Sequence, residues 1–282
     1  MDLSVEAHAP SSFCAVAAPD DFYYASLYLP AVARDVTRIL EATRRAITDI
    51  PGSCSDRGVA HLKLAWWQTE LQQLALAAPR HPLTRALQPI IKHEPALLAI
   101  FEHLIVYTVS SLNAAPLPNR AALLDDVQAQ HGPLLEYYVS LGMAVDTRER
   151  AALVGLGCVL ELAYALRGLR QHRRGAPLLL PNEELRAAGL SDDAVRNAHT
   201  SGELSAVLVP YLDWLHDELV TRNAALPRRL RRQQRLLSTL ALCAAEALAL
   251  TKADACCVLE RRVEVLPVRK LWLAWRTAWW GG

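Results

Sequence analysis

The residues best suited to chemistry are four arginines within a short stretch, Arg167, Arg170, Arg173 and Arg174. Guanidinium groups bind phosphate through paired hydrogen bonds without a metal ion, so these side chains could form an anion site. Alternatively, they decorate the C-terminus of a helix, where cations suit the helix dipole and remain in water. The sequence leaves both interpretations open.

Carboxylates are the second candidate group, but they do not form a metal-binding pattern. Magnesium takes several oxygen ligands, which carboxylates one helical turn apart can supply. Asp49 lies alone before Pro51-Gly52, where a capping or solvated carboxylate is the simpler interpretation, and Glu161 could offer one further carboxylate. One acid at each place cannot hold several magnesium ions, so we expect no bound metal.

No motif of another enzyme class is present. The nine histidines and six cysteines lack zinc-ligand spacing, and the sequence contains no GxSxG, GxGxxG or GxxxxGK[ST] motif. His172 is interpreted as a surface histidine near a helix end. We therefore assign no catalytic residue, no metal ligand and no cofactor.

Helices must position these side chains, because apolar residues recur at helical spacing and the alternation typical of strands is missing. Pro30 begins the first predicted helix, Pro51-Gly52-Ser53 ends it, and a break is expected near Gly132-Pro133. The predicted helices cover residues 30–50, 57–76, 95–113, 119–143, 147–173, 203–224, 228–251 and 268–279. The chain is therefore all-α.

Composition favours one large domain without a general electrostatic partner. The 282 residues are 52% hydrophobic, which supports a single helical domain over 21–282 behind a flexible N-terminal segment, 1–20. A formal net charge of +1 gives no reason to expect nucleic-acid binding. Without a signal peptide or an apolar span of about 18 residues, we expect a cytoplasmic protein, with peripheral contact to the inner face of a membrane as an open option.

Two surfaces could contact a partner. Four arginines, Arg228, Arg229, Arg231 and Arg232, stand at a predicted helix start, where the dipole disfavours cations and an anionic membrane or acidic protein would be favourable. The C-terminal helix mixes basic residues with tryptophans, and Trp279 and Trp280 at its tip could be exposed at an interface. The alternative for the arginines is a solvated basic face. In the C-terminal helix we expect Leu271, Trp272 and Trp275, which share helical spacing, to dock on the core and leave only Trp279 and Trp280 exposed.

Four segments resemble the squalene/phytoene synthase family. They are FYYASLYLP at 22–30, LAWWQTEL at 64–71, ELAYALRGLRQHRRGAPLLLP at 161–181 and RRVEVLPVRKLWLAWR at 261–276. The resemblance implies the isoprenoid synthase fold, a single helical bundle around a central apolar cavity. It also implies two facing helices, each with two aspartates that hold magnesium against a prenyl diphosphate.

This chain departs from the family at the positions that carry its chemistry. Glu161 and Tyr164 stand where the family usually has glutamine and asparagine, and Asp21 replaces a serine where its charge would repel a diphosphate. Asp49 is out of register with the family ligands. The four aspartate positions read Thr48, Gly52, Gly168 and His172.

The resemblance and the departures together predict a diverged, catalytically inactive family member. We expect it to bind a prenyl or other apolar ligand and to act as a binding, accessory or assembly factor in isoprenoid or respiratory-complex biogenesis, since some family members resemble complex I assembly factors. The alternative is an active prenyl-diphosphate transferase that couples two prenyl diphosphates head to head with magnesium. A third possibility is an inactive subunit that supports an active paralogue.

Overall fold

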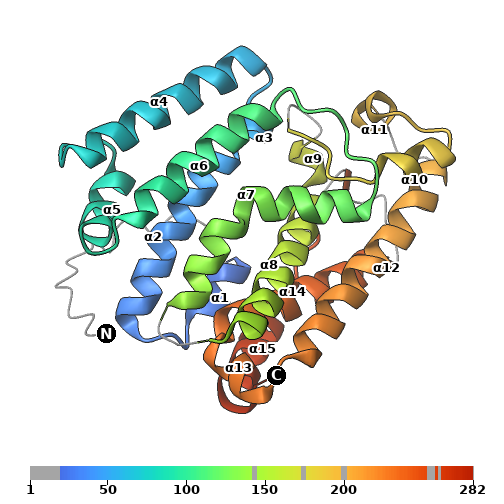
Figure 1. Ribbon diagram of the computed structural model, residues 1–282. Coiled ribbons are helices and arrows are strands. Elements are labelled where there is room, and N and C mark those ends of the chain that lie inside the picture. Colours follow the sequence, from blue (N-terminus) through green and yellow to red (C-terminus); the bar gives the residue numbers. More distant parts are fainter. Residues whose placement is uncertain are drawn as a thin grey trace.

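The structure is a computed structural model that describes residues 20–141, 145–172, 176–197, 202–252, 258–259 and 262–281, with the side chains of 171 and 172 excepted. Over these residues the secondary structure is helical, and none of them lies in a strand (Figure 1). The predicted all-α fold is confirmed. The N-terminal segment predicted to be flexible lies, except for Asp20, outside the described residues.

The helices pack side by side in one bundle (Figure 1). Along the described chain they are α1 (Asp21–Ser26), α2 (Ala31–Thr48), α3 (Ile50–Ser53), α4 (Arg57–Ala75), α5 (Pro82–His93), α6 (Ala96–Ser111), α7 (Arg120–Ser140), α8 (Thr147–Arg167), α9 (Leu169–His172), α10 (Asn182–Ala187), α11 (Asp192–Asn197), α12 (Gly202–Ala225), α13 (Arg228–Gln233), α14 (Arg235–Thr251) and α15 (Pro267–Trp280).

Side-chain caps define the starts of several long helices. Asp56, Asn119 and Asp146 each accept a hydrogen bond from a backbone N–H in the first turn of α4, α7 and α8. Such caps satisfy donors that have no partner within the helix and stabilise it by about 1 kcal/mol each. At the start of α8, the side chain of Glu149 accepts a hydrogen bond from the backbone N–H of Asp146, which completes a capping box.

Two apolar clusters fill the interior. The larger lies among α7, α8, α12 and α14, and the smaller among α2, α4, α5 and α6. Helix α7 joins them, because Leu123 and Val127 belong to the larger cluster and Leu134 to the smaller. The helices that flank this junction, α2 and α8, are the two that the sequence singled out.

Proline and glycine misled the prediction of several helix boundaries. No helix was predicted between residues 76 and 95, but Pro82 occupies the first turn of α5, where its missing N–H has no helical partner to lose. Pro51 and Gly52 lie inside the short helix α3, and α7 continues through Pro133 without a break. The helix predicted over 228–251 is interrupted at Gln234.

Three cysteines in the described part of the chain, Cys54, Cys158 and Cys243, are buried free thiols. Among the helices of the described residues, none has both the length and the apolarity required to cross a bilayer.

Candidate functional site

A cavity of about 600 Å³ lies among α2, α5, α7, α8 and α14. Its walls are apolar side chains that include Val36, Ile39, Leu134, Leu160 and Leu240. The expected central apolar cavity is therefore present.

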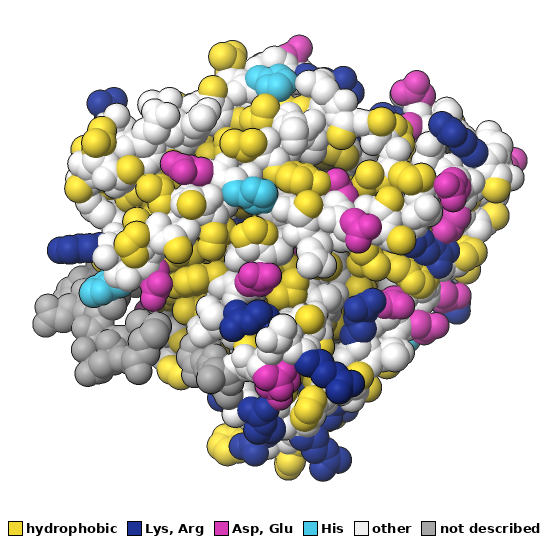
Figure 2. All heavy atoms as spheres, viewed as in Figure 1, with side chains coloured by type: hydrophobic (Ala, Val, Ile, Leu, Met, Phe, Trp, Pro, Cys, Tyr) yellow, Lys and Arg dark blue, Asp and Glu magenta, His cyan; other side chains and the backbone are white. Residues whose placement is uncertain are grey.

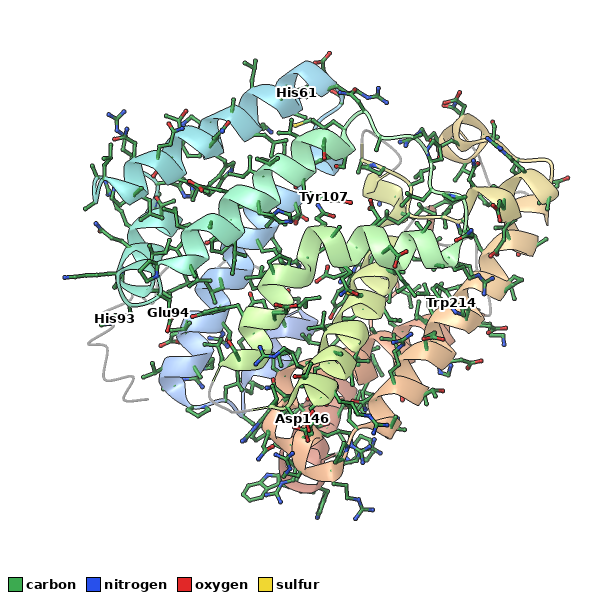
Figure 3. The ribbon with its side chains drawn as sticks, in the orientation of Figure 1. His61, His93, Glu94, Tyr107, Asp146 and Trp214 are labelled. Carbon is green, nitrogen blue, oxygen red and sulfur yellow. The ribbon has the colours of Figure 1, made fainter. Side chains whose placement is uncertain are left out.

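The cavity has an exposed rim and a buried base. Exposed Arg85, His93 and Gln233 lie at the rim, and Figure 3 shows His93 at the end of α5. At the base, Glu41 and His131 are only 8% and 7% exposed. An apolar ligand that enters past the rim therefore meets polar side chains at the far end.

An arginine links the two facing helices at this base. Arg44 of α2 binds Glu41 through both carboxylate oxygens, with its Nε 2.7 Å and its Nη2 2.8 Å from them. Its remaining nitrogen, Nη1, lies 3.3 Å from Oε2 of Glu161 on α8. One guanidinium thus bridges two carboxylates that come from opposite sides of the cavity.

The neighbouring arginine completes this arrangement. Glu41, Arg44 and Arg45 lie one turn apart on one face of α2, so both arginines reach the same carboxylate. The Nε of Arg45 donates to Glu41 at 2.5 Å, and its Nη1 donates to Asp20 at 2.5 Å. Burial by itself would raise the pKa of Glu41, but the charges of Arg44 and Arg45 lower it to about 2.

A second buried ion network connects α1, α8 and α15. Arg167 is fully buried and donates from Nη1 to Asp21 at 2.7 Å, and the Nζ of Lys270 lies 2.7 Å from the other oxygen of Asp21. Lys270 also bonds to Glu264 at 2.7 Å. Burial opposes ionisation of Asp21, but the adjacent Arg167 and Lys270 lower its pKa below the ordinary value.

The family model of squalene/phytoene synthase matches residues 17–269. This chain belongs to the squalene/phytoene synthase family. Two solved structures share its fold, and both are distant in sequence. The squalene synthase HpnC from Alicyclobacillus acidocaldarius is 19% identical, with a TM-score of 0.62 over 83% of this chain and 88% of that one. A dehydrosqualene synthase in complex with ligand is 18% identical, with a TM-score of 0.68 over 91% and 89%. None of the curated proteins matches the chain.

The two solved structures confirm the isoprenoid synthase-type fold that the resemblance implies. At identities this low they establish the fold alone, and the synthase activity or bound ligand of each of these proteins concerns that protein. The chemistry of this squalene/phytoene synthase family member must therefore be argued from its own side chains.

The donors at the cavity base of this family member do not fit magnesium. Both carboxylates, Glu41 and Glu161, already face the guanidinium of Arg44, so a divalent cation beside them would also meet a fixed positive charge. Over the described residues, no three or more histidine, cysteine, aspartate or glutamate side chains gather as metal ligands.

The degenerate aspartate positions lie near one another but outside the cavity lining. Thr48 and Asp49 end α2, Gly52 lies in α3 and Gly168 ends α8. Helix α3 packs against α9, which ends at His172, so the structure brings the two motif segments together. Thr48 donates to the backbone of Arg44 at 3.1 Å.

Asp49 lies away from the cavity, whereas Glu161 and Tyr164 of α8 lie in its wall. Asp49 is exposed at the helix end and lies outside the large cavity. Glu161 and Tyr164 do line the cavity. Of the degenerate positions, these two therefore remain in a place where they could touch a ligand.

The arginines considered for anion binding are not gathered in one environment. Arg167 is buried against Asp21, whereas Arg170 is exposed on α9. Arg173 and Arg174 lie outside the described residues. Asp21, expected to repel a diphosphate, instead supplies the anion that Arg167 and Lys270 bind.

The two surfaces chosen from the sequence meet in space. Helices α13 and α15 are in contact, and Arg231 donates to the backbone carbonyls of Gly281, Asn223 and Ala224. A Cβ on Gly281 would lie only 2.8 Å from the carbonyl oxygen of Arg228, so glycine permits this close contact. Gly281 also adopts a left-handed conformation at the end of α15, which favours glycine.

We call the exposed side chains of Arg228, Arg232, Trp279 and Trp280 the basic-aromatic surface. Trp279 and Trp280 are 59% and 57% exposed, and both arginines are exposed on α13. Figure 2 shows basic and apolar side chains together at this end of the molecule. Arg229 is also exposed but pairs with Glu149 at 2.5 Å.

The expected docking of Leu271, Trp272 and Trp275 on the core is wrong. The buried residues of α15 are Lys270, Leu273, Ala274 and Thr277, whereas the exposed fractions of the three expected residues are 42%, 39% and 38%. Trp272 contacts charged neighbours instead, since the guanidinium carbons of Arg269 and Arg276 lie 4.5 and 4.7 Å from the centre of its ring. Trp275 packs edge-to-face against Trp280. Lys270 belongs to the buried network because its partners Asp21 and Glu264 neutralise it.

Sequence reasoning missed the residues that form the cavity base. Glu41, Arg44 and Arg45 carried a usable signal, since a glutamate and two arginines at i, i+3 and i+4 share one helix face. His131 and Tyr138 of α7, which also line the cavity, share a face by their separation of two turns. Neither pattern by itself says that the face is buried.

Acid should weaken the fold through Glu41. Its pKa of about 2 in the folded protein is lower than the pKa of about 4.3 expected in the unfolded chain, so the ionised form stabilises the fold above the unfolded pKa. This contribution is lost as the pH falls from about 5 to 2. Glu41→Gln should therefore flatten the dependence of the free energy of unfolding on pH in that window.

Urea titrations at several pH values measure this effect. At neutral pH, Glu41→Gln should also cost about 3–5 kcal/mol, because the arginines lose a buried partner. Glu136→Gln, at an exposed glutamate of α7, is the control. A pH dependence that is the same in wild type and Glu41→Gln would contradict the role given to this carboxylate.

Asp21→Asn should strongly destabilise the protein. The change leaves Arg167 and Lys270 buried without their shared carboxylate, which typically costs about 3–5 kcal/mol. Glu246→Gln breaks the partly exposed pair with Arg269 and should cost less than about 1 kcal/mol. Equal losses of melting temperature in the two variants would show that the buried network contributes no more to stability than a partly exposed ion pair.

Proposed function

We propose that this chain is a catalytically inactive member of the squalene/phytoene synthase family. It binds a prenyl or other apolar ligand in its cavity and acts as an accessory or assembly factor in isoprenoid or respiratory-complex biogenesis. The observation that carries the proposal is the bridge from Arg44 to Glu41 and Glu161, which occupies the carboxylates of the cavity base. The four positions where the resemblance implies metal-binding aspartates carry no acid, since they read Thr48, Gly52, Gly168 and His172.

The chemistry of the family explains why this bridge matters. Ionisation of an allylic diphosphate leaves a highly charged group, which hard divalent cations must neutralise. In this chain the carboxylates at the cavity base are held by arginine. Arg167 and Lys270, two cations that could otherwise hold an anion, are held by Asp21. Internal ion pairs thus engage both the carboxylates that could hold a metal ion and the cations that could hold a diphosphate.

Retention of the cavity supports a binding role. The walls remain apolar while the ionic groups at the base are paired with one another, an arrangement suited to an apolar molecule. The similar structure of a dehydrosqualene synthase was solved in complex with a ligand. A prenyl chain or a molecule of similar character is accordingly the ligand class that we propose.

The basic-aromatic surface supports peripheral binding to a membrane. Exposed indoles favour the boundary between water and lipid, and arginines are attracted to anionic headgroups. We propose a cytoplasmic protein that binds peripherally to the inner face of an anionic membrane through Arg228, Arg232, Trp279 and Trp280. A protein partner on the same surface, such as an active paralogue, is the alternative that vesicle binding distinguishes.

The purified protein should not release pyrophosphate from farnesyl or geranylgeranyl diphosphate in the presence of magnesium. The expected result is a rate equal to that of heat-denatured protein, because the carboxylates needed for the metal are missing or paired. Metal-dependent release that Glu161→Ala or Asp49→Ala abolishes would instead support the alternative, an active prenyl-diphosphate transferase with an atypical site.

Vesicle co-sedimentation should depend on the basic-aromatic surface. Replacing Arg228 and Arg232 with glutamine should weaken binding to vesicles that contain anionic lipid by tenfold or more, at about 1 kcal/mol for each arginine. Replacing Trp279 and Trp280 with alanine should also weaken it. The melting temperature should change little, because all four side chains are exposed.

Trp66→Ala is the matched control, since this tryptophan is 48% exposed on the distant helix α4. Equal losses in the control and the surface variants would argue against a defined membrane surface. Retained binding in all of them would do the same.

A further inference from the structure

The base of the cavity contains two polar atoms that the protein itself leaves unsatisfied. Nδ1 of His131 and the hydroxyl of Tyr138 are buried and find no hydrogen-bond partner among the described residues. Both residues line the cavity, and His131 is only 7% exposed. A buried polar group without a partner costs about 1–3 kcal/mol, so a ligand that bonds to these atoms would recover that energy.

Both groups are uncharged at neutral pH. Burial lowers the pKa of His131, and the imidazole is therefore neutral. Burial and the nearby charge of Glu41 raise the pKa of Tyr138, so its hydroxyl keeps its proton. The phenol can donate a hydrogen bond, and the imidazole nitrogen can donate or accept one according to its tautomer.

Among the described residues at the cavity base, each arginine already has carboxylate partners. Arg44 is held by Glu41 and Glu161, and Arg45 is held by Glu41 and Asp20. This cluster contains three carboxylates and two guanidinium groups, so negative charge is in slight formal excess. A diphosphate placed here would therefore meet repulsion rather than attraction. The remaining basic side chains of the lining, Arg85 and His93, are exposed at the rim.

From this combination of an apolar cavity, paired charges and two unsatisfied neutral groups, we propose that the ligand is a neutral lipid with an oxygen-bearing head group. The head is a hydroxyl or a carbonyl that bonds to Tyr138 and His131, and the body is a long hydrocarbon chain in contact with the apolar walls. The proposal rests on the proposed binding function and narrows its ligand class, because it excludes the diphosphate head that the family resemblance implies.

Three molecules with one hydrocarbon chain and different heads provide the test. Farnesol has a hydroxyl, farnesyl diphosphate has a charged head, and farnesene has no polar head. Quenching of tryptophan fluorescence and competition with a fluorescent fatty alcohol measure their dissociation constants on the full-length protein with magnesium present. We expect farnesol to bind about tenfold more tightly than either of the others, as one well-made buried hydrogen bond permits.

Variants of two adjacent tyrosines separate head-group recognition from packing. Tyr138→Phe should weaken farnesol about tenfold and leave farnesene unchanged. Tyr137→Phe is the matched control, because Tyr137 also lines the cavity but its hydroxyl is not among the unsatisfied buried atoms. His131→Leu should likewise weaken farnesol more than farnesene.

The possible outcomes distinguish this inference from the proposed function. Tighter binding of farnesyl diphosphate than of farnesol, no measurable binding of farnesol, or equal effects of the two tyrosine variants would each overturn the neutral-head proposal. Pyrophosphate measured in the same samples tests the proposed function separately, since its release would show turnover whatever the order of affinities.

Discussion

The contact of Arg44 with Glu41 and Glu161 is the interaction on which the cavity depends. Buried charges are costly unless each has a partner, and removing one partner leaves the others uncompensated. This guanidinium binds one carboxylate of its own helix and one from α8, so it fixes the polarity of the base and links helices on opposite sides of the cavity. Single substitutions are therefore disfavoured here, and these residues should change together or not at all.

The same solution appears in the network of Asp21, Arg167 and Lys270. A carboxylate from α1 neutralises cations from α8 and α15, and it ties these three helices together. In both networks, charged side chains of the protein pair with one another rather than with an external ion. The family fold can keep its cavity under these conditions, because apolar packing of the surrounding helices supplies the main stability and does not require a bound metal.

Helix α13 connects the rim of the cavity to the basic-aromatic surface. Gln233 lines the cavity, whereas Arg228 and Arg232 of the same short helix are exposed beside the end of α15. Arg231 holds the two helices together through the carbonyl of Gly281. A lipid ligand and a membrane surface are chemically consistent partners for such an arrangement, because each offers an apolar body with an oxygen-rich boundary.

The sequence by itself determined the helical class and the loss of the four aspartates, because periodicity and residue identity are local properties. Tertiary structure decided which charged residues are buried. The sequence did not show that Arg167 and Lys270 are buried beside Asp21, and Asp21 lies 146 residues from Arg167 in the chain. Likewise, 117 residues separate Arg44 from Glu161. A charge is stable in the interior only beside its partner, and that distance is set by packing rather than by sequence spacing.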